Sequence, residues 1–241
     1  MFPIICQVGP VSVYSYGLML VIAFFVSSFL ASQEAKKRGM QEGIIFNLLF
    51  TAFIWGVIGA RAFYVIENLD FYRHDLIEII KLQHGGLSWY GGLILGAGSG
   101  AIYLKKKKQP LYKVLDLIIP FVALGQAIGR IGCLLNGCCY GRESQFGIYF
   151  PAHDSVLIPT QIYSSLTLVI IFVILRFLQA KPHSEGEIFF TYLLLYSIKR
   201  FLVEFSRADN PIIFYKFTLF QIISFAFFCL SVIRLLRIKS R

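Results

Sequence analysis

Charge is what this sequence has least of. Only 15% of its 241 residues are charged, whereas 57% are hydrophobic, and the mean hydropathy is +0.69. A soluble domain of this length cannot bury that much apolar surface, and long apolar runs with few charges are typical of membrane spans. The composition therefore argues against an ordinary soluble protein and predicts an all-α integral membrane protein.

Acidic side chains are also few, with 13 against 23 basic ones and a net charge of +10. Fourteen of the basic residues fall in alternate connections between apolar runs, at 36–38, 105–108 with 113, 176 with 181, and 234–241. Cytoplasmic loops are enriched in Lys and Arg. This distribution predicts an N-terminus outside and a cytoplasmic C-terminus, and it gives no reason to expect a nucleic-acid partner.

The five cysteines do not form the pattern of a disulfide framework. Cys6 lies near the start and Cys229 in an apolar run, while Cys133, Cys138 and Cys139 are crowded together. We also expect no separate cleavable signal, because the first apolar run is about as long as a span and is followed by basic residues at 36–38.

Seven apolar segments are predicted to be transmembrane helices, near 13–32, 43–66, 87–104, 114–135, 159–179, 187–205 and 217–236. The third is short and rich in glycine, which lets neighbouring helices approach closely. We predict one transmembrane domain over 1–241, with outward-facing loops at 67–86 and 140–158. Apolar spacing in the first loop predicts a short amphipathic helix on the outer surface.

Charged side chains inside spans are costly and usually face a cavity or a partner. Five qualify here: Arg61, Arg130, Lys199, Arg200 and Glu204. Arg200 and Glu204 are four residues apart and share a helical face with Tyr196. That pair can instead be a buried ion pair that fixes helix packing. Lys199 is interpreted as a side chain that reaches out to the membrane surface.

Arg130 lies between Gly129 and Gly132, which leave room around its guanidinium. A guanidinium binds phosphate through two parallel hydrogen bonds, and the abundant phosphates of a bilayer are lipid headgroups. Tyr16, Tyr90 and Gln161 fall at the outer ends of their predicted spans, although interfacial tyrosines are also common as anchors. Together these residues predict an outward-facing site for an anionic phospholipid.

Six segments in order resemble the prolipoprotein diacylglyceryl transferases of bacterial inner membranes. They are Ser15 to Met19, Gly59-Ala60-Arg61, Gly85 to Gly96, Gly129 to Gly132 with Asn136, Gly137, Gly141 and Arg142, Pro159 to Tyr163, and Arg200 to Arg207. The resemblance covers nearly the whole chain and implies a multi-pass protein of the bacterial cytoplasmic membrane.

The resemblance implies transfer of the diacylglyceryl group of phosphatidylglycerol to the lipobox cysteine thiol in the signal peptide of a prolipoprotein. The family's essential arginines match Arg130 and Arg200. The substrate-binding residues that we predict are Tyr16, Arg61, Asn136, Gly141, Gln161, Tyr196 and Glu204. Besides these two substrates we expect only membrane lipids as partners, and neither a metal nor an organic cofactor.

Three positions depart from the family pattern. The family usually has a histidine at Tyr90, an asparagine at Cys133 and a glutamate at Cys138. Tyrosine, with a reference pKa of about 10, is a poor base at neutral pH. We place Tyr90 among the catalytic residues, where it orients the lipid while the acceptor thiol loses its proton by another route.

Two further interpretations of the chain remain open. It can be a paralogue that uses the same lipid site with another acceptor, or that carries lipid on its own cysteine. Alternatively, Cys133, Cys138 and Cys139 can form a redox or zinc site in a membrane protein of another class.

Overall fold

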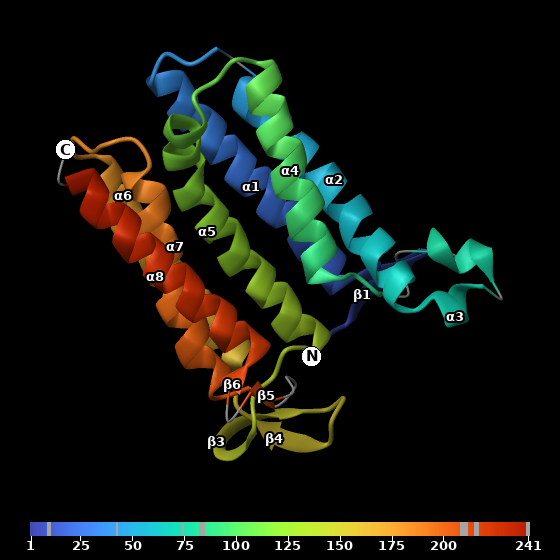
Figure 1. Cartoon of the computed structure of the whole chain (residues 1–241). Helices are drawn as coiled ribbons and strands as arrows, with labels where there is room; N and C mark the ends of the chain where they lie inside the picture. The colour runs from blue at the N-terminus through green and yellow to red at the C-terminus, as the bar shows by residue number, and fades with distance from the viewer. Residues whose placement is uncertain are drawn as a thin grey trace. The chain divides into compact units, whose positions relative to one another are not determined.

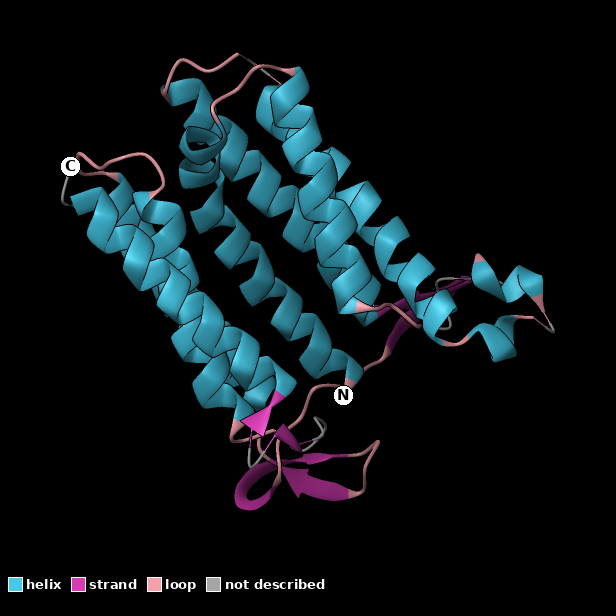
Figure 2. Cartoon of the chain, viewed as in Figure 1, coloured by secondary structure: helices cyan, strands magenta, loops and turns pink. Residues whose placement is uncertain are grey.

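The computed structural model describes residues 1–8, 11–41, 43–73, 75–81, 85–207, 212–214 and 217–239, and most of them are helical (Figures 1 and 2). The long helices are α1 (Ser15–Lys37), α2 (Ile44–Glu67), α4 (Trp89–Lys106), α5 (Leu111–Asn136), α6 (Thr160–Gln179), α7 (Glu187–Glu204) and α8 (Leu219–Lys239). Each predicted apolar segment coincides with one of these helices to within a few residues.

Five helices of the described chain are long and apolar enough to cross a membrane: α1, α2, α5, α6 and α8. α4 is diluted by glycine, and α7 carries the charges of Glu187, Lys199, Arg200 and Glu204. These compositions explain why α4 and α7 do not stand out by hydropathy. That all seven helices cross the membrane stays a prediction.

The described residues contain three antiparallel hairpins, one before α1 and two between helices, and the all-α prediction did not include them. They are β1 (Ile4–Val8) with β2 (Val11–Tyr14), β3 (Glu143–Phe150) with β4 (Ser155–Leu157), and β5 (Ile212–Phe214) with β6 (Phe217–Thr218). Such short pairs carry too little hydrophobic periodicity to be recognised in sequence. Where the structure describes the 67–86 loop, the predicted amphipathic helix is replaced by two short turns, α3 (Leu69–Tyr72) and η1 (Leu76–Ile79).

The chain forms two compact units, residues 1–27 with 115–241 and residues 28–114. In the smaller unit α2 packs against α4 through glycine. A Cβ at Gly59 would collide with the carbonyl oxygen of Gly91, and a Cβ at Gly91 with that of Gly59. The close approach that we predicted for the glycines is confirmed at these two positions. It is also confirmed at Gly96, where a Cβ would lie 3.1 Å from the Ala52 oxygen, but a Cβ at Gly98 would meet no atom within 4 Å.

In the larger unit, α7 packs against α6 and α8. The apolar core between α5, α6 and α7 consists of Ile119, Ala123, Ile171, Leu175, Ile188 and Tyr192. Asp116 of α5 caps the start of α7, because its carboxylate accepts hydrogen bonds from the backbone nitrogens of Gly186 (2.5 Å) and Phe189 (2.8 Å). These contacts hold one end of the three helices, and the polar residues of interest lie at the other end.

Candidate functional site

The scaffold of the site is the place where the turn after α5, the start of α6 and the end of α7 meet. The backbone nitrogen of Gly141 donates to the Ile158 oxygen, and that of Arg142 to the Ser206 oxygen, both at 2.9 Å. A Cβ at Gly141 would lie 2.8 Å from Ile158 Cβ and from Thr160 Cγ2. Only glycine fits where these three segments cross, which gives Gly141 a structural reason to be there.

At the end of α7, one carboxylate organises two arginines. Arg200 Nη2 lies 3.1 Å and Arg207 Nε 3.9 Å from Glu204 Oε2. The other oxygen of Glu204 accepts a hydrogen bond from Thr218 Oγ1 at 2.7 Å, and the Glu204 side chain is completely buried. The Arg200 guanidinium also lies 4.5 Å from the centre of the Phe220 ring. Sequence spacing anticipated the Arg200–Glu204 pair but missed Arg207 and Thr218.

Positive charge exceeds negative charge around this carboxylate. Arg130, Arg200 and Arg207 lie close enough for their charges to act on Lys199, and Arg130 and Arg207 also act on Arg200. Lys199 is buried, with its Nζ 5.1 Å from the centre of the Tyr196 ring. The prediction that Lys199 reaches out to the surface is therefore wrong. Arg130, Lys199, Arg200 and Arg207, here called the cationic group, therefore lie near one another, and Glu204 pairs with two of them, Arg200 and Arg207. Such a group is suited to bind an anion.

Tyr16 joins this group because α1 packs closely on α5. A Cβ at Gly132 would lie 2.9 Å from Met19 Cβ and 3.5 Å from Tyr16 Cα. That approach brings the Tyr16 hydroxyl close enough to Arg130 and to the three cysteines to interact with them electrostatically. Tyr196 interacts with Arg130 in the same way. The larger unit thus brings Tyr16, Tyr196 and Arg200 within electrostatic reach of Arg130, and Arg200 pairs with Glu204.

The three crowded cysteines meet in space. The Sγ atoms of Cys133, Cys138 and Cys139 all lie within 4.8 Å of one another. Asn136, the last residue of α5, hydrogen-bonds the Cys138 thiol through its side chain. Gln161 Nε2 donates to the Cys138 oxygen at 2.7 Å, while its buried Oε1 has no hydrogen-bond partner among the described residues. Asn136 and Gln161 therefore contact the thiol turn directly.

The environment of Cys139 favours its thiolate. Hydrogen bonds from Cys133 and Cys138, together with the charges of Arg207 and Arg130, lower the pKa of the Cys139 thiol below its usual range. The thiolate is the form of cysteine that acts as a nucleophile or binds a metal. The turn at 137–142 therefore holds a thiol that favours its thiolate form, within electrostatic reach of Arg130 and Arg207.

Arg61, which we predicted to bind substrate, contacts backbone oxygens in this structure. Its side chain is buried in the smaller unit, where Nε donates to the Ile79 oxygen at 2.9 Å. The Nη atoms donate to four more carbonyl oxygens, those of Glu78, Lys81, Gly85 and Gly86. All five N–H donors of the guanidinium are used. This geometry favours a role in holding the backbone at 78–81 and 85–86, rather than a contact with substrate.

Tyr90 lies in the first turn of α4, in the smaller unit, and its ring meets that of Trp89 edge to face at 5.5 Å. The preceding Ser88 is fixed to α2, because its backbone nitrogen donates to the Ala60 oxygen at 2.9 Å. Arg130 and Arg200 belong to the other unit, so the part of Tyr90 in catalysis stays a prediction.

With this geometry in place, the comparison with known proteins is decisive. The profile of the prolipoprotein diacylglyceryl transferase family matches residues 3–237. The chain belongs to this family. Similar proteins named phosphatidylglycerol–prolipoprotein diacylglyceryl transferase include those of Clostridium tetani (36% identical over 87% of this chain and 86% of that protein) and Listeria innocua (34%, 95% and 87%). That of Streptococcus pyogenes is 36% identical over 86% of this chain and 84% of its own length.

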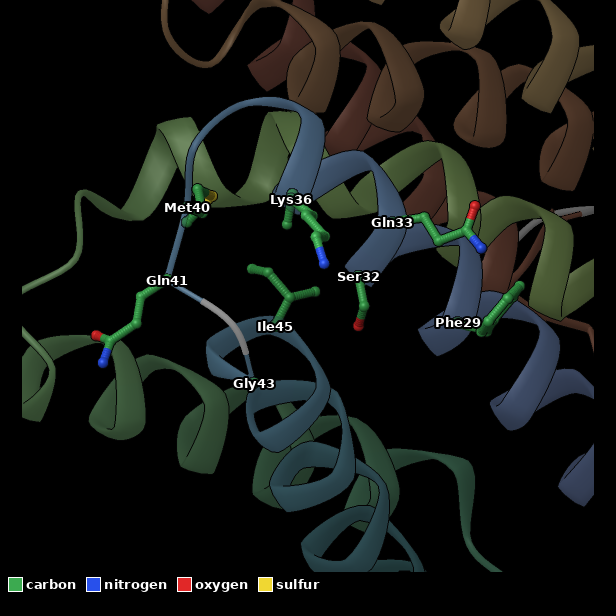
Figure 3. Close-up of a pocket in the computed structure, with 9 residues that line it drawn as sticks. Phe29, Ser32, Gln33, Lys36, Met40, Gln41, Gly43 and Ile45 are labelled. Atoms are coloured by element: carbon green, nitrogen blue, oxygen red, sulfur yellow. The ribbon is translucent and has the colours of Figure 1, made fainter.

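A hollow of about 230 Å³ lies between the end of α1 and the start of α2 (Figure 3). Its lining consists of Phe29, Ser32, Gln33, Ala35, Lys36, Met40, Gln41, Gly43 and Ile45. Lys36 is the one charged side chain among them, so the hollow lacks the paired charges of the cationic group. The transferase family motif Gly129 to Gly132 lies near the end of α5, and Arg200 to Arg207 covers the end of α7 and the residues that follow it.

Proposed function

We propose that this chain transfers the diacylglyceryl group of phosphatidylglycerol to the lipobox cysteine thiol of a prolipoprotein. The observation that carries the proposal is the cationic group of Arg130, Lys199, Arg200 and Arg207, in which Glu204 pairs with Arg200 and Arg207. Its excess positive charge fits an anionic phosphate. Membership of the family, and the printed names of its relatives, give the reaction.

The chemistry is a displacement at carbon. The acceptor thiolate attacks C3 of the glycerol that bears the two acyl chains, and the bond from this carbon to the phosphate oxygen breaks. Negative charge grows on the departing glycerol phosphate, where Arg130 and Arg200 stabilise it. Glu204 orients Arg200 by the 3.1 Å ion pair. We assign lipid and acceptor contacts to Tyr16, Asn136, Gln161 and Tyr196, and a backbone role to Gly141.

The two residues of the smaller unit have separate roles in this proposal. Tyr90 orients the lipid, as its place in the Gly85 to Gly96 motif implies. Arg61 acts as a positioning residue, because its five donors hold the backbone at 78–81 and at 85–86, where that motif begins. Both assignments rest on the family pattern together with the local geometry of the 28–114 unit.

We further propose seven transmembrane helices in the bacterial cytoplasmic membrane, with the N-terminus outside and the C-terminus in the cytoplasm. Support comes from the ends of the helices. The site lies at the end of α5 and α7 and the start of α6, whereas the basic residues Arg176 and Lys181 lie at the opposite end of α6. The site would then open outward with the 67–86 and 140–158 loops.

A transfer assay tests the proposal. The purified chain in detergent is incubated with phosphatidylglycerol and a lipobox peptide, and release of glycerol phosphate is measured. Removal of one transition-state donor typically costs about 100- to 1,000-fold in rate, so we expect at least that loss from Arg130→Ala. Arg234→Ala, in the exposed basic end of α8, is the control.

A different acceptor is the second candidate, favoured by the unusual thiol turn. If the folded chain binds phosphatidylglycerol in an Arg130-dependent way but releases no glycerol phosphate with the lipobox peptide, the transferase proposal fails for this acceptor. Lipid attached to one of the chain's own cysteines, detected by mass spectrometry, would then support a paralogue that uses the same lipid site.

A further inference from the structure

The displacement described above leaves Cys133, Cys138 and Cys139 without a task, although their Sγ atoms lie within 4.8 Å of one another. We infer that these thiols form a binding centre for a thiophilic divalent cation, Zn²⁺, whose fourth coordination position takes the acceptor thiol. The first half of this inference stands on the cysteines alone, and the second half rests on the proposed transferase function.

The spacing of the sulfur atoms suits zinc. With Zn–S bonds of about 2.3 Å, the sulfur atoms of a tetrahedral site are about 3.8 Å apart. The three Sγ atoms, already within 4.8 Å, need to close by no more than about 1 Å, which rotation of the side chains supplies. A set made only of sulfur selects zinc or copper(I) over magnesium or calcium, which prefer oxygen.

The backbone of the turn is shaped to bring the thiols together. On regular backbone, consecutive side chains point in different directions. Here α5 ends at Asn136, and both Gly137 (φ 77°) and Cys139 (φ 64°) adopt left-handed backbone conformations. A positive φ at a residue other than glycine is uncommon, and in this structure it also occurs at Lys108 and Asp154. At Cys139 it turns the side chain toward the other two thiols.

Side chains from α6 fix this backbone in place. Thr160 Oγ1 donates to the Cys139 oxygen at 2.6 Å, and Gln161 Nε2 donates to the Cys138 oxygen at 2.7 Å. Thr160 and Gln161 are both almost fully buried. Hydrogen bonds of this kind orient metal ligands and set the affinity of a metal site.

The surrounding charge also fits. Three thiolates and one Zn²⁺ carry a net charge of −1, which is costly to bury without a counter-charge. Arg130 and Arg207 lie close enough for their charges to act on Cys139. The cationic group thus compensates the centre on one side and holds phosphate on the other.

One coordination position stays open for a substrate. His153 approaches this turn, but its Nε2 lies 3.2 Å from the Gly137 oxygen and so is directed at the backbone. Cys133 is buried, whereas Cys138 and Cys139 are partly exposed, so the centre can be reached from their side. Three protein ligands with one open position are typical of catalytic zinc.

The zinc centre would promote deprotonation of the acceptor thiol, a task for which Tyr90 is a poor base. The acceptor thiol forms a sulfur–zinc bond and gives its proton to water, because a thiol that coordinates zinc is deprotonated. Its sulfur then attacks glycerol C3 as a new carbon–sulfur bond forms. The carbon–oxygen bond breaks, its electron pair leaves with glycerol phosphate, and the thioether product releases the metal.

Metal content tests the first half. The full chain in detergent, kept reduced and stripped with a chelator, is loaded with Zn²⁺ and analysed by mass spectrometry for bound metal. We expect one zinc per chain, lost in Cys138→Ser and Cys139→Ser but kept in Cys229→Ser, whose cysteine lies in α8. Circular dichroism confirms that each variant is folded. A folded wild-type chain without zinc, or with a disulfide among the three thiols instead, overturns the inference.

Cobalt spectroscopy tests the second half without turnover. The Co²⁺-loaded chain is mixed with a lipobox peptide and with the same peptide carrying serine for cysteine. We expect the sulfur-to-cobalt charge-transfer absorption to rise with the cysteine peptide alone. An unchanged spectrum overturns the role in acceptor binding even if transfer is active. A changed spectrum without transfer supports the centre and contradicts the proposed function, so the two failures are distinguishable.

Discussion

At the scale of single residues, Glu204 is the centre of the cationic group. It contacts Arg200, Arg207 and Thr218, and its side chain has no exposed surface. Loss of its charge would leave the arginines to repel one another and free the guanidinium of Arg200 to turn away from the phosphate. The orientation of the Arg200 side chain therefore depends on its ion pair with Glu204, one turn further along α7.

We predict that Glu204→Gln lowers the rate of transfer about 10- to 100-fold, because hydrogen bonds to charged groups contribute about 1.5–3 kcal/mol. The amide keeps the shape and can still accept from Thr218 Oγ1. The measurement is kcat and KM for glycerol phosphate release, with Glu187→Gln at the other end of α7 as the control. Equal rates for Glu204→Gln and wild type would contradict the role of Glu204.

Arg61 offers a second test at this scale. Its five hydrogen bonds to backbone oxygens imply that Arg61→Ala frees the segment around Glu78 and Ile79. We expect faster hydrogen exchange of the backbone amides at 77–81, without loss of lipid binding. Arg73→Ala is the matched control, because the Arg73 side chain is exposed and forms a surface ion pair of 3.3 Å with the exposed Asp70. Unchanged exchange in Arg61→Ala would contradict a positioning role.

At the scale of elements, the crossing of α2 and α4 depends on two glycines. The carbonyl oxygen of Gly91 lies where a Cβ on Gly59 would be, and the carbonyl oxygen of Gly59 lies where a Cβ on Gly91 would be. We predict that Gly59→Ala destabilises the chain by about 1–3 kcal/mol, as overpacking does, with a lower Tm in detergent. Gly98→Ala, which meets no atom within 4 Å, should keep or raise the Tm. A similar Tm for both variants would contradict this close packing.

At the scale of the whole molecule, the predicted orientation exposes Cys6 outside the cell. Cys6 lies in β1 and is exposed. In intact spheroplasts, a membrane-impermeant maleimide should label Cys6, and in an Arg237→Cys variant it should label position 237 only after permeabilisation. Labelled peptides are identified by mass spectrometry, which separates them from Cys138 and Cys139. Labelling at 237 in intact cells would reverse the orientation.

Hydropathy anticipated the helices because each turn of a lipid-exposed helix must present apolar side chains and satisfy its backbone internally. The four-residue spacing of Tyr196, Arg200 and Glu204 also predicted that they share one helical face, since an α-helix repeats every 3.6 residues. The burial of Lys199, the partners of Arg61 and the presence of Arg207 beside Glu204 were not predictable in this way. Those contacts join residues whose mutual orientation depends on how helices and turns pack.

The sequence by itself determined the seven helical segments, the arginines Arg130 and Arg200 and the crowding of three cysteines, because each is a local property of composition or spacing. Only the tertiary structure decided that Arg130 of α5 joins the basic side chains at the end of α7 and that the thiols converge within 4.8 Å. The reason is physical. Both groups depend on hydrogen bonds and close approaches between α1, α5, α6 and α7, which are distant in sequence and whose packing no local pattern encodes.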